Sequence, residues 1–189
     1  PALASAFRCG SLGLLHPDVV QARLEREYDL SLILSAPSVR YRVVLNDDSE
    51  VWVDNPTFYP DPGSIKEAYE PYIKATIMTP ERYLGTVMEL CRERRGVDTT
   101  YNFLAAGRME VISQLPLAEV LFDFYDRLKL ITQGYGCFVY RLLDYRLGDM
   151  VKVDILVNGE KVDALSQLVH REFSRPRALR YCERLAKKI

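Results

Sequence analysis

The sequence predicts an α+β protein built around a ferredoxin-like βαββαβ unit. Between residues 72 and 145, apolar patterns of strand and helix period follow one another in the order strand, helix, strand, strand, helix, strand. Of the 189 residues, 48% are hydrophobic and 27% are charged, as in ordinary globular proteins. No apolar run approaches the roughly 18 residues that cross a bilayer. We therefore expect an intracellular globular protein.

Each element of this unit has a local signal. The first strand, YIKATIMT, alternates polar and apolar residues, and Thr79 and Pro80 then suggest an N-cap and a first helical residue. The helix PERYLGTVMELCRERR is expected to stop at Gly96. Strands VDTTYNFL and RMEVISQLPL are separated by a turn at residues 105–107. The helix AEVLFDFYDRLKLIT, which ends near Gly134, and the strand YGCFVYRLLDY complete the order.

Two further segments flank the unit. Before the unit, the sequence indicates a short strand, a glycine turn, a helix near Pro17 and a strand through Tyr41. These elements predict half of a second ferredoxin-like domain. After the unit, Asn158-Gly159 predicts a type I′ turn in a β-hairpin. A C-terminal helix follows this hairpin.

Charge is strongly segregated, although the net charge is only −1. Residues 46–70 hold seven acidic side chains against one lysine, together with several prolines, and are the best candidate for a connector. The string VVLNDDSEVWV, at the start of this connector, also predicts a hairpin turn. Residues 171–189 hold five arginines and two lysines against two glutamates. This basic helix either meets a phosphate backbone or is a solvated helix face.

Sequence motifs for catalysis are absent. The chain has no GxxxxGK[ST] phosphate loop, no GxGxxG and no GxSxG. Its two histidines lack partners at metal-ligand spacing. We therefore predict no catalytic residue, no cofactor-binding residue and no metal site in this chain.

Several basic residues are candidates for nucleic-acid contact. Arg92, Arg94 and Arg95 lie in the last turn of a predicted helix, where they either complement the helix dipole or bind phosphates. His16 lies near the start of a predicted helix. It either serves as an acid, a base or an RNA contact, or it is a histidine packed at a strand-to-helix corner.

Long strings in the chain resemble one family. They are RCGSLGLLH, QARLEREYDL, SAPSVRYRV, IKATIMTPERYLGTVMELCRERRGV, LPLAEVLFDFYDRLK and VKVDILVNGEKVDALSQLVHR. Together they resemble the LepA translational GTPases, also called elongation factor 4, from about Phe7 to the end. The DILVNGEKVDALS hairpin favours this family over elongation factor G and BipA.

The resemblance implies a domain organisation. Residues 1–45 would be the C-terminal half of domain III, 46–70 an acidic connector, 71–148 the ferredoxin-like domain V, and 149–189 the start of the C-terminal region. The parent protein would be a GTPase that uses GTP and Mg²⁺ bound outside this chain.

The resemblance also implies partners. The parent would bind the ribosome, act on elongation by back-translocation of tRNA or in translation fidelity, and meet tRNA through a region beyond this chain. Its location would be the bacterial cytoplasm or an organelle, with a peripheral membrane association. The residues expected to contact the ribosome are Arg8, His16, Arg92, Arg94, Arg95, Arg175, Arg177 and Arg180. The rival interpretation is a ferredoxin-like regulatory module that binds a small ligand or a protein partner.

Overall fold

The computed structural model describes residues 15–32, 39–121 and 123–186. The chain divides into two compact units, Pro1–Pro37 and Ser38–Ile189. In the first unit, helix α1 (Leu15–Tyr28) is the predicted opening helix. The strand and glycine turn expected before it lie outside the described residues.

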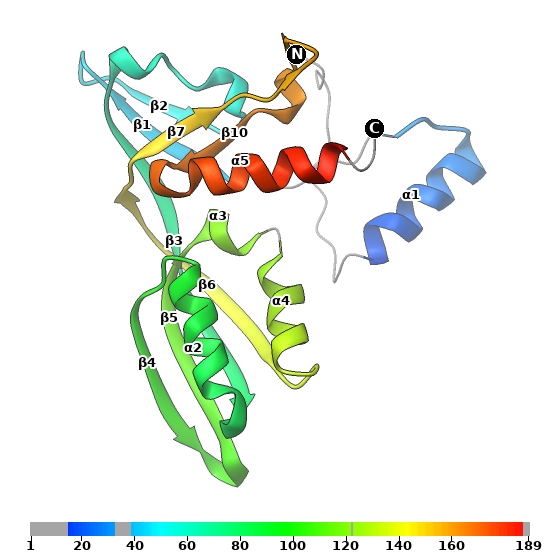
Figure 1. Ribbon diagram of the computed structural model, residues 1–189, viewed down its shortest axis with the longest axis vertical. Coiled ribbons are helices and arrows are strands. Elements are labelled where there is room, and N and C mark those ends of the chain that lie inside the picture. Colours follow the sequence, from blue (N-terminus) through cyan, green and yellow to red (C-terminus); the bar gives the residue numbers. More distant parts are fainter. Residues whose placement is uncertain (1–14, 33–38, 122, 187–189) are drawn as a thin grey trace. The chain divides into compact units, whose positions relative to one another are not determined.

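One half of the second unit is a four-stranded antiparallel sheet with helices on one face (Figure 1). Its elements in chain order are β3 (Ile65–Pro80), α2 (Leu84–Glu93), β4 (Val97–Leu104), β5 (Arg108–Pro116), α3 (Leu117–Val120), α4 (Phe124–Ile131) and β6 (Cys137–Leu147). The strands lie in the order β4-β5-β3-β6, and α2 and α4 pack into one core with β3 and β5. This βαββαβ arrangement confirms the predicted ferredoxin-like fold class.

The other half of the second unit shares strand β3. Strands β1 (Tyr41–Leu45) and β2 (Glu50–Val53) form a hairpin, and β1 pairs with the first residues of β3. Strands β7 (Met150–Val153) and β10 (Gln167–His170) form a separate antiparallel pair, against which α5 (Arg171–Ala186) packs. Side chains from β1, β2, β3, β7 and β10 meet in a second core.

Two turns confirm their sequence signals. In the β1–β2 turn, the Asp47 carboxylate accepts hydrogen bonds from the backbone N–H of Ser49 at 3.0 Å and from its hydroxyl. In the hairpin of β8 (Leu156–Val157) and β9 (Glu160–Lys161), Asn158 and Gly159 have φ of 55° and 84°. A type I′ turn requires positive φ at both positions, so the predicted turn forms.

Strand β3 changes the face that it buries part-way along its length. Ala68 packs in the core of the β1–β2 half, whereas Ile73, Ala75 and Ile77 pack in the ferredoxin-like core. Side chains alternate along a strand, so these two sets belong to opposite phases of the alternation. The change falls between Glu70 and Ile73, where β6 also shifts its register against β3.

The acidic segment is built into this half rather than standing apart from it. It contains β2 and two short 3-10 helices, Pro56–Phe58 and Pro62–Ser64, and the Tyr59 hydroxyl donates to the Met150 carbonyl at 3.2 Å. The boundary expected between residues 70 and 71 lies within β3. The strand through Tyr41, expected to finish the opening half-domain, pairs here with β2 and β3. The assignment of segments to named domains stays a prediction.

Two local expectations need correction. Thr79 is not an N-cap: it still belongs to β3, its side chain is buried, and its hydroxyl has no hydrogen-bond partner among the described residues. A 3-10 turn at Glu81–Tyr83 precedes α2 instead. The single helix expected over 118–132 is two helices, of which α3 ends at Val120 and α4 begins at Phe124.

Helix α2 ends in a tight reversal. Arg95 has φ of 61°, and the Gly96 N–H donates to the Cys91 carbonyl at 2.8 Å. A Cβ atom at Gly96 would lie 2.7 Å from that carbonyl oxygen and 2.7 Å from the Ser113 hydroxyl. Glycine is therefore required here by close approach to neighbouring atoms.

We expect Gly96→Ala to lower the free energy of unfolding by about 1–3 kcal/mol, because the added methyl group overpacks the helix end. The matched control is Gly85→Ala in α2, where a Cβ atom meets nothing within 4 Å. This control should raise stability by about 0.5 kcal/mol, because alanine favours helix. Urea unfolding measures both, and equal effects would contradict the packing argument.

Candidate nucleic-acid interface

Arg95 is held inside the protein by a buried carboxylate. Its guanidinium donates to both carboxylate oxygens of Glu70, at 3.0 and 2.5 Å. The Glu70 side chain is 1% exposed and that of Arg95 is 14% exposed. On the other side, a Cβ atom at Gly148 would lie 2.7 Å from a Glu70 oxygen, so the backbone packs directly on the carboxylate. The left-handed conformation of Arg95 thus accompanies a bidentate buried ion pair.

A second buried acid joins this pair to the C-terminal helix. Arg177 of α5 donates to Glu119 of α3, and a guanidinium nitrogen of Arg95 lies 4.0 Å from another oxygen of Glu119. We call Glu70, Arg95, Glu119 and Arg177 the charge cluster. Its two positive and two negative charges balance, which is the condition for burying ions at moderate cost.

Burial shifts pKa values in and beside this cluster. It raises the pKa of Glu119 above the ordinary 4.5, and this effect outweighs the lowering by Arg177, Arg95 and Arg94. Burial also raises the pKa of the Tyr41 hydroxyl, and the nearby Glu70 and Glu119 carboxylates add to the rise.

The sequence-predicted arginines fall into two groups. Arg94 pairs with Asp123 at 2.8 Å with a side chain 15% exposed, so Arg94, Arg95 and Arg177 are all engaged in internal ion pairs. By contrast, the Arg92 side chain is 81% exposed, and its nearest acid, Glu89, is 3.6 Å away.

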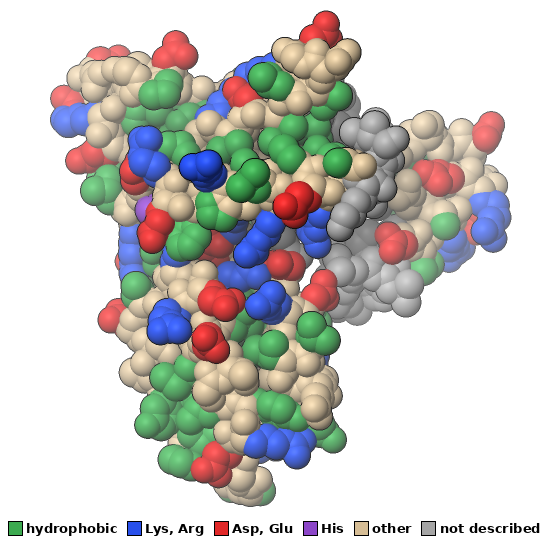
Figure 2. Space-filling view, in the orientation of Figure 1, with side chains coloured by type: hydrophobic (Ala, Val, Ile, Leu, Met, Phe, Trp, Pro, Cys, Tyr) green, Lys and Arg blue, Asp and Glu red, His purple; other side chains and the backbone are tan. Residues whose placement is uncertain are grey.

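The other candidates lie on α5 or in the first unit. Arg175 and Arg180 are exposed on α5, and Figure 2 shows basic side chains along this helix. His16 is the second residue of α1. Arg8 lies outside the described residues. The structure thus leaves Arg92, Arg175 and Arg180 as the basic side chains, among the described candidates, that face solvent.

Sequence reasoning missed the two buried acids. Glu70 stands at the end of the acidic segment, whose composition predicts a connector rather than a buried site. Glu119 stands inside the apolar string LPLAEVLF, and an acid flanked by apolar residues is the signal that would have indicated a buried partner for an arginine.

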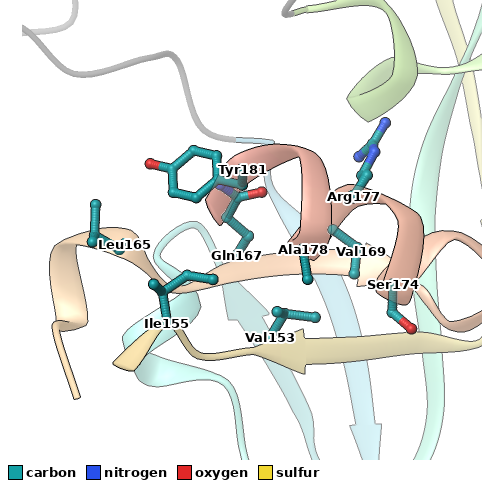
Figure 3. A pocket seen from close by; sticks show the side chains of 9 residues that line it. All are labelled: Val153, Ile155, Leu165, Gln167, Val169, Ser174, Arg177, Ala178 and Tyr181. Carbon is teal, nitrogen blue, oxygen red and sulfur yellow. The ribbon is translucent and has the colours of Figure 1, made fainter. Parts of the chain in front are cut away.

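Cavities offer little room beside α5. A cavity of about 10 Å³ lies between α5 and the β7–β10 pair, lined in part by Val153, Val169 and Ala178 (Figure 3). This volume holds about one water molecule. Among the described residues, no group of three or more His, Cys, Asp or Glu side chains is placed to hold a metal ion. None of the described helices has the length and apolar character to cross a membrane.

Comparison with known proteins adds to this geometry. A family model described as "Elongation factor G C-terminus" matches residues 67–156. The protein "Elongation factor 4" of Syntrophus aciditrophicus is 62% identical over 188 residues, which cover 100% of this chain and 31% of that protein. The chain is similar to elongation factor 4 over its whole length.

Other elongation factor 4 sequences agree. "Elongation factor 4 2" of Rhodopirellula baltica is 60% identical and "Elongation factor 4" of Streptococcus gordonii is 50% identical, again over 100% of this chain and 31% of the relative. The resemblance inferred from the motifs is confirmed. The chain spans about a third of the length of these elongation factor 4 relatives.

We expect Glu70→Gln to lower the free energy of unfolding by about 3 kcal/mol, because the buried Arg95 would lose its bidentate partner and keep only Glu119, 4.0 Å away. The matched control is Glu89→Gln, which removes the same charge from the exposed pair with Arg92. Its effect should stay below about 1 kcal/mol. Both are read from urea unfolding curves, and a loss no larger than that of the control would show that the buried pair is dispensable.

We expect Glu119 to make stability depend on pH. Its folded-state pKa is raised, so the folded chain binds this proton more tightly than the unfolded chain. The associated stability is present at low pH and is lost as pH rises from 4.5 through the raised pKa. In Glu119→Gln this part of the pH dependence should vanish. Urea midpoints measured from pH 4.5 to about 7 test it, and parallel curves for both proteins would contradict it.

Proposed function

We propose that this chain is a ribosome-docking part of a LepA-type translational GTPase. The observation that carries the proposal is the similarity to elongation factor 4 along all of the chain, at up to 62% identity among the relatives named above. The match of residues 67–156 to the elongation factor G C-terminus and the ferredoxin-like order of strands support it. The setting would be the cytoplasm of a bacterium or an organelle, where ribosomes are present.

In this proposal GTP hydrolysis belongs to the parent protein. GTP and Mg²⁺ would bind in parts of the elongation factor 4 relatives that lie outside this chain, which spans 31% of their length. Contact with tRNA would likewise come from a region beyond the chain, and the parent would associate peripherally with membranes. Back-translocation of tRNA and translation fidelity are the processes in which the parent would act.

The described chain would contribute a stiff docking body. The charge cluster fastens α5 to α3 and to the end of α2, so the ferredoxin-like half and the C-terminal helix are held together. Exposed Arg92, Arg175 and Arg180 would then meet rRNA phosphates, releasing counterions on binding. Arg94, Arg95 and Arg177 would act indirectly, by holding the surfaces that carry these contacts.

The rival function, a regulatory module for a small ligand, has less support. The cavity beside α5 has room for about one water molecule. A second hollow of about 550 Å³, lined by Gly85, Met88, Glu89, Arg92, Gly96 and Thr99, lies wide open to solvent, whereas ligand sites bury most of their ligand.

Co-sedimentation with purified ribosomes across a salt series tests the proposal, with elongation factor G as competitor. We expect Arg175→Ala combined with Arg180→Ala to weaken binding and to lower the slope of log affinity against log salt by about 1 to 2, because up to two phosphate contacts are lost.

The matched control is Arg171→Ala on the same helix, whose guanidinium is paired with Asp149 at 2.6 Å. It should leave the slope nearly unchanged. Failure of the wild-type chain to sediment with ribosomes, when circular dichroism shows it folded, would overturn the proposed docking role. An unchanged salt slope in the double variant would show that Arg175 and Arg180 take no part in docking.

A further inference from the structure

An exposed stack of one arginine and two aromatic rings lies where the β1–β2 hairpin meets β6. The guanidinium carbon of Arg40 lies 4.8 Å from the ring centroid of Trp52. Tyr145 of β6 meets the same indole edge-on, with 5.2 Å between ring centroids and 83° between planes. The three side chains come from segments nearly a hundred residues apart in sequence and form one surface feature, which we call the aromatic platform.

The strand register places the platform away from the core. Trp52 faces Arg42 across the hairpin, whereas the next pair, Tyr41 and Val53, packs in the core of this half. Side chains alternate between the two faces of a sheet, so Trp52 and Arg42 point to the opposite, solvated face. Trp52 is 43% exposed and Tyr145 is 38% exposed, which leaves aromatic surface free for a ligand.

Two further arginine–aromatic pairs lie close in sequence to the platform. The guanidinium carbon of Arg42 lies 4.2 Å from the Tyr69 ring centroid, and that of Arg146 lies 4.5 Å from the Tyr72 ring centroid. These two arginines also have acidic partners, at 3.3 Å to Glu50 and at 3.0 Å to Asp144. The positive charges of Arg42 and Arg146 are therefore compensated by these acids.

Arg40 differs from these two arginines. Within the described ranges it makes no ion pair, and its exposed guanidinium rests on the indole alone. The platform thus combines a positive charge that no described acid neutralises with partly free aromatic surface. A phosphate matches the first feature and a flat base matches the second, which is how proteins hold unpaired nucleotides.

We propose that the Trp52–Tyr145 pair is a binding site for an unpaired base of ribosomal RNA, in which the base stacks on one ring and meets the other edge-on, with Arg40 bound to the adjacent phosphate. The inference rests on the proposed ribosome docking and adds a site and a ligand class to it. An RNA loop supplies the splayed base that the rings require, whereas a regular duplex hides its base faces.

Trp52 is the only tryptophan of the chain, so its fluorescence reports directly on the site. The 189-residue chain is titrated with a 12-nucleotide oligouridylate and, separately, with a 12-base-pair RNA duplex. We expect quenching by the single strand and an affinity about tenfold lower for Tyr145→Leu, since one stacked base is lost. Arg40→Ala should lower the salt slope by about 0.7. Equal quenching by the duplex would overturn base stacking.

Matched variants separate the site from general effects. Phe103→Leu removes a more exposed ring on β4, 68% exposed, and should leave oligouridylate binding unchanged. Trp52→Phe keeps a ring and should retain sedimentation with ribosomes, whereas Trp52→Ala should lower it about tenfold. Circular dichroism confirms folding of each variant. Equal losses for Phe103→Leu and Tyr145→Leu would overturn the assignment to the platform.

The ribosome experiment also distinguishes the two levels of proposal. If the wild-type chain fails to sediment with ribosomes, the docking function itself is wrong. If it sediments and Trp52→Ala and Tyr145→Leu sediment equally well, docking stands and the platform is not part of it. Quenching by intact tRNA in preference to fragments of ribosomal RNA would overturn the choice of ribosomal RNA as the source of the base.

Discussion

The buried ion pair between Glu70 and Arg95 is the constraint on which the second unit depends. Glu70 lies at the point where β3 stops serving one core and begins serving the other, so its carboxylate is enclosed from both sides. An unpaired carboxylate in this place would be very costly. The bidentate guanidinium offsets that cost. Arg95 adopts a left-handed conformation beside this pair, and Gly148 lets the backbone approach the Glu70 carboxylate closely.

The same pair explains why a cluster of arginines in sequence has more than one role. Arg92, Arg94 and Arg95 crowd one helix end, but each meets a different environment within a few ångströms. The direction of each side chain relative to the acids of neighbouring elements decides whether its charge is consumed internally or presented to solvent. Guanidinium groups suit both roles because they bind carboxylates and phosphates with the same fork of donors.

Local signals predicted most of the fold, and long-range partners account for the rest. The range of β4 matched its sequence string, and the turn at Asn158-Gly159 formed because its backbone requirements are local. The burial of Glu70 depends on a partner 25 residues away, and no local pattern carries that information. Likewise, the pairing of β1 with β3 was hidden by an acidic, proline-rich composition typical of linkers. Among the site residues, sequence identified arginines but not which of them face solvent.

Strand β3 belongs to both cores, and this shared membership has a mechanical consequence for the second unit. The 16 residues of β3 span about 50 Å when extended, and hydrogen bonds hold this strand to β1, β5 and β6 along that length. The middle of the strand is the weakest part of this ladder, because β1 pairs only as far as Tyr69, β5 pairs only from Tyr72, and β6 shifts its register between Pro71 and Ile73. A load applied to the C-terminal helix would therefore flex the unit first at this junction, where the charge cluster ties α5 to the ferredoxin-like half and resists the bend.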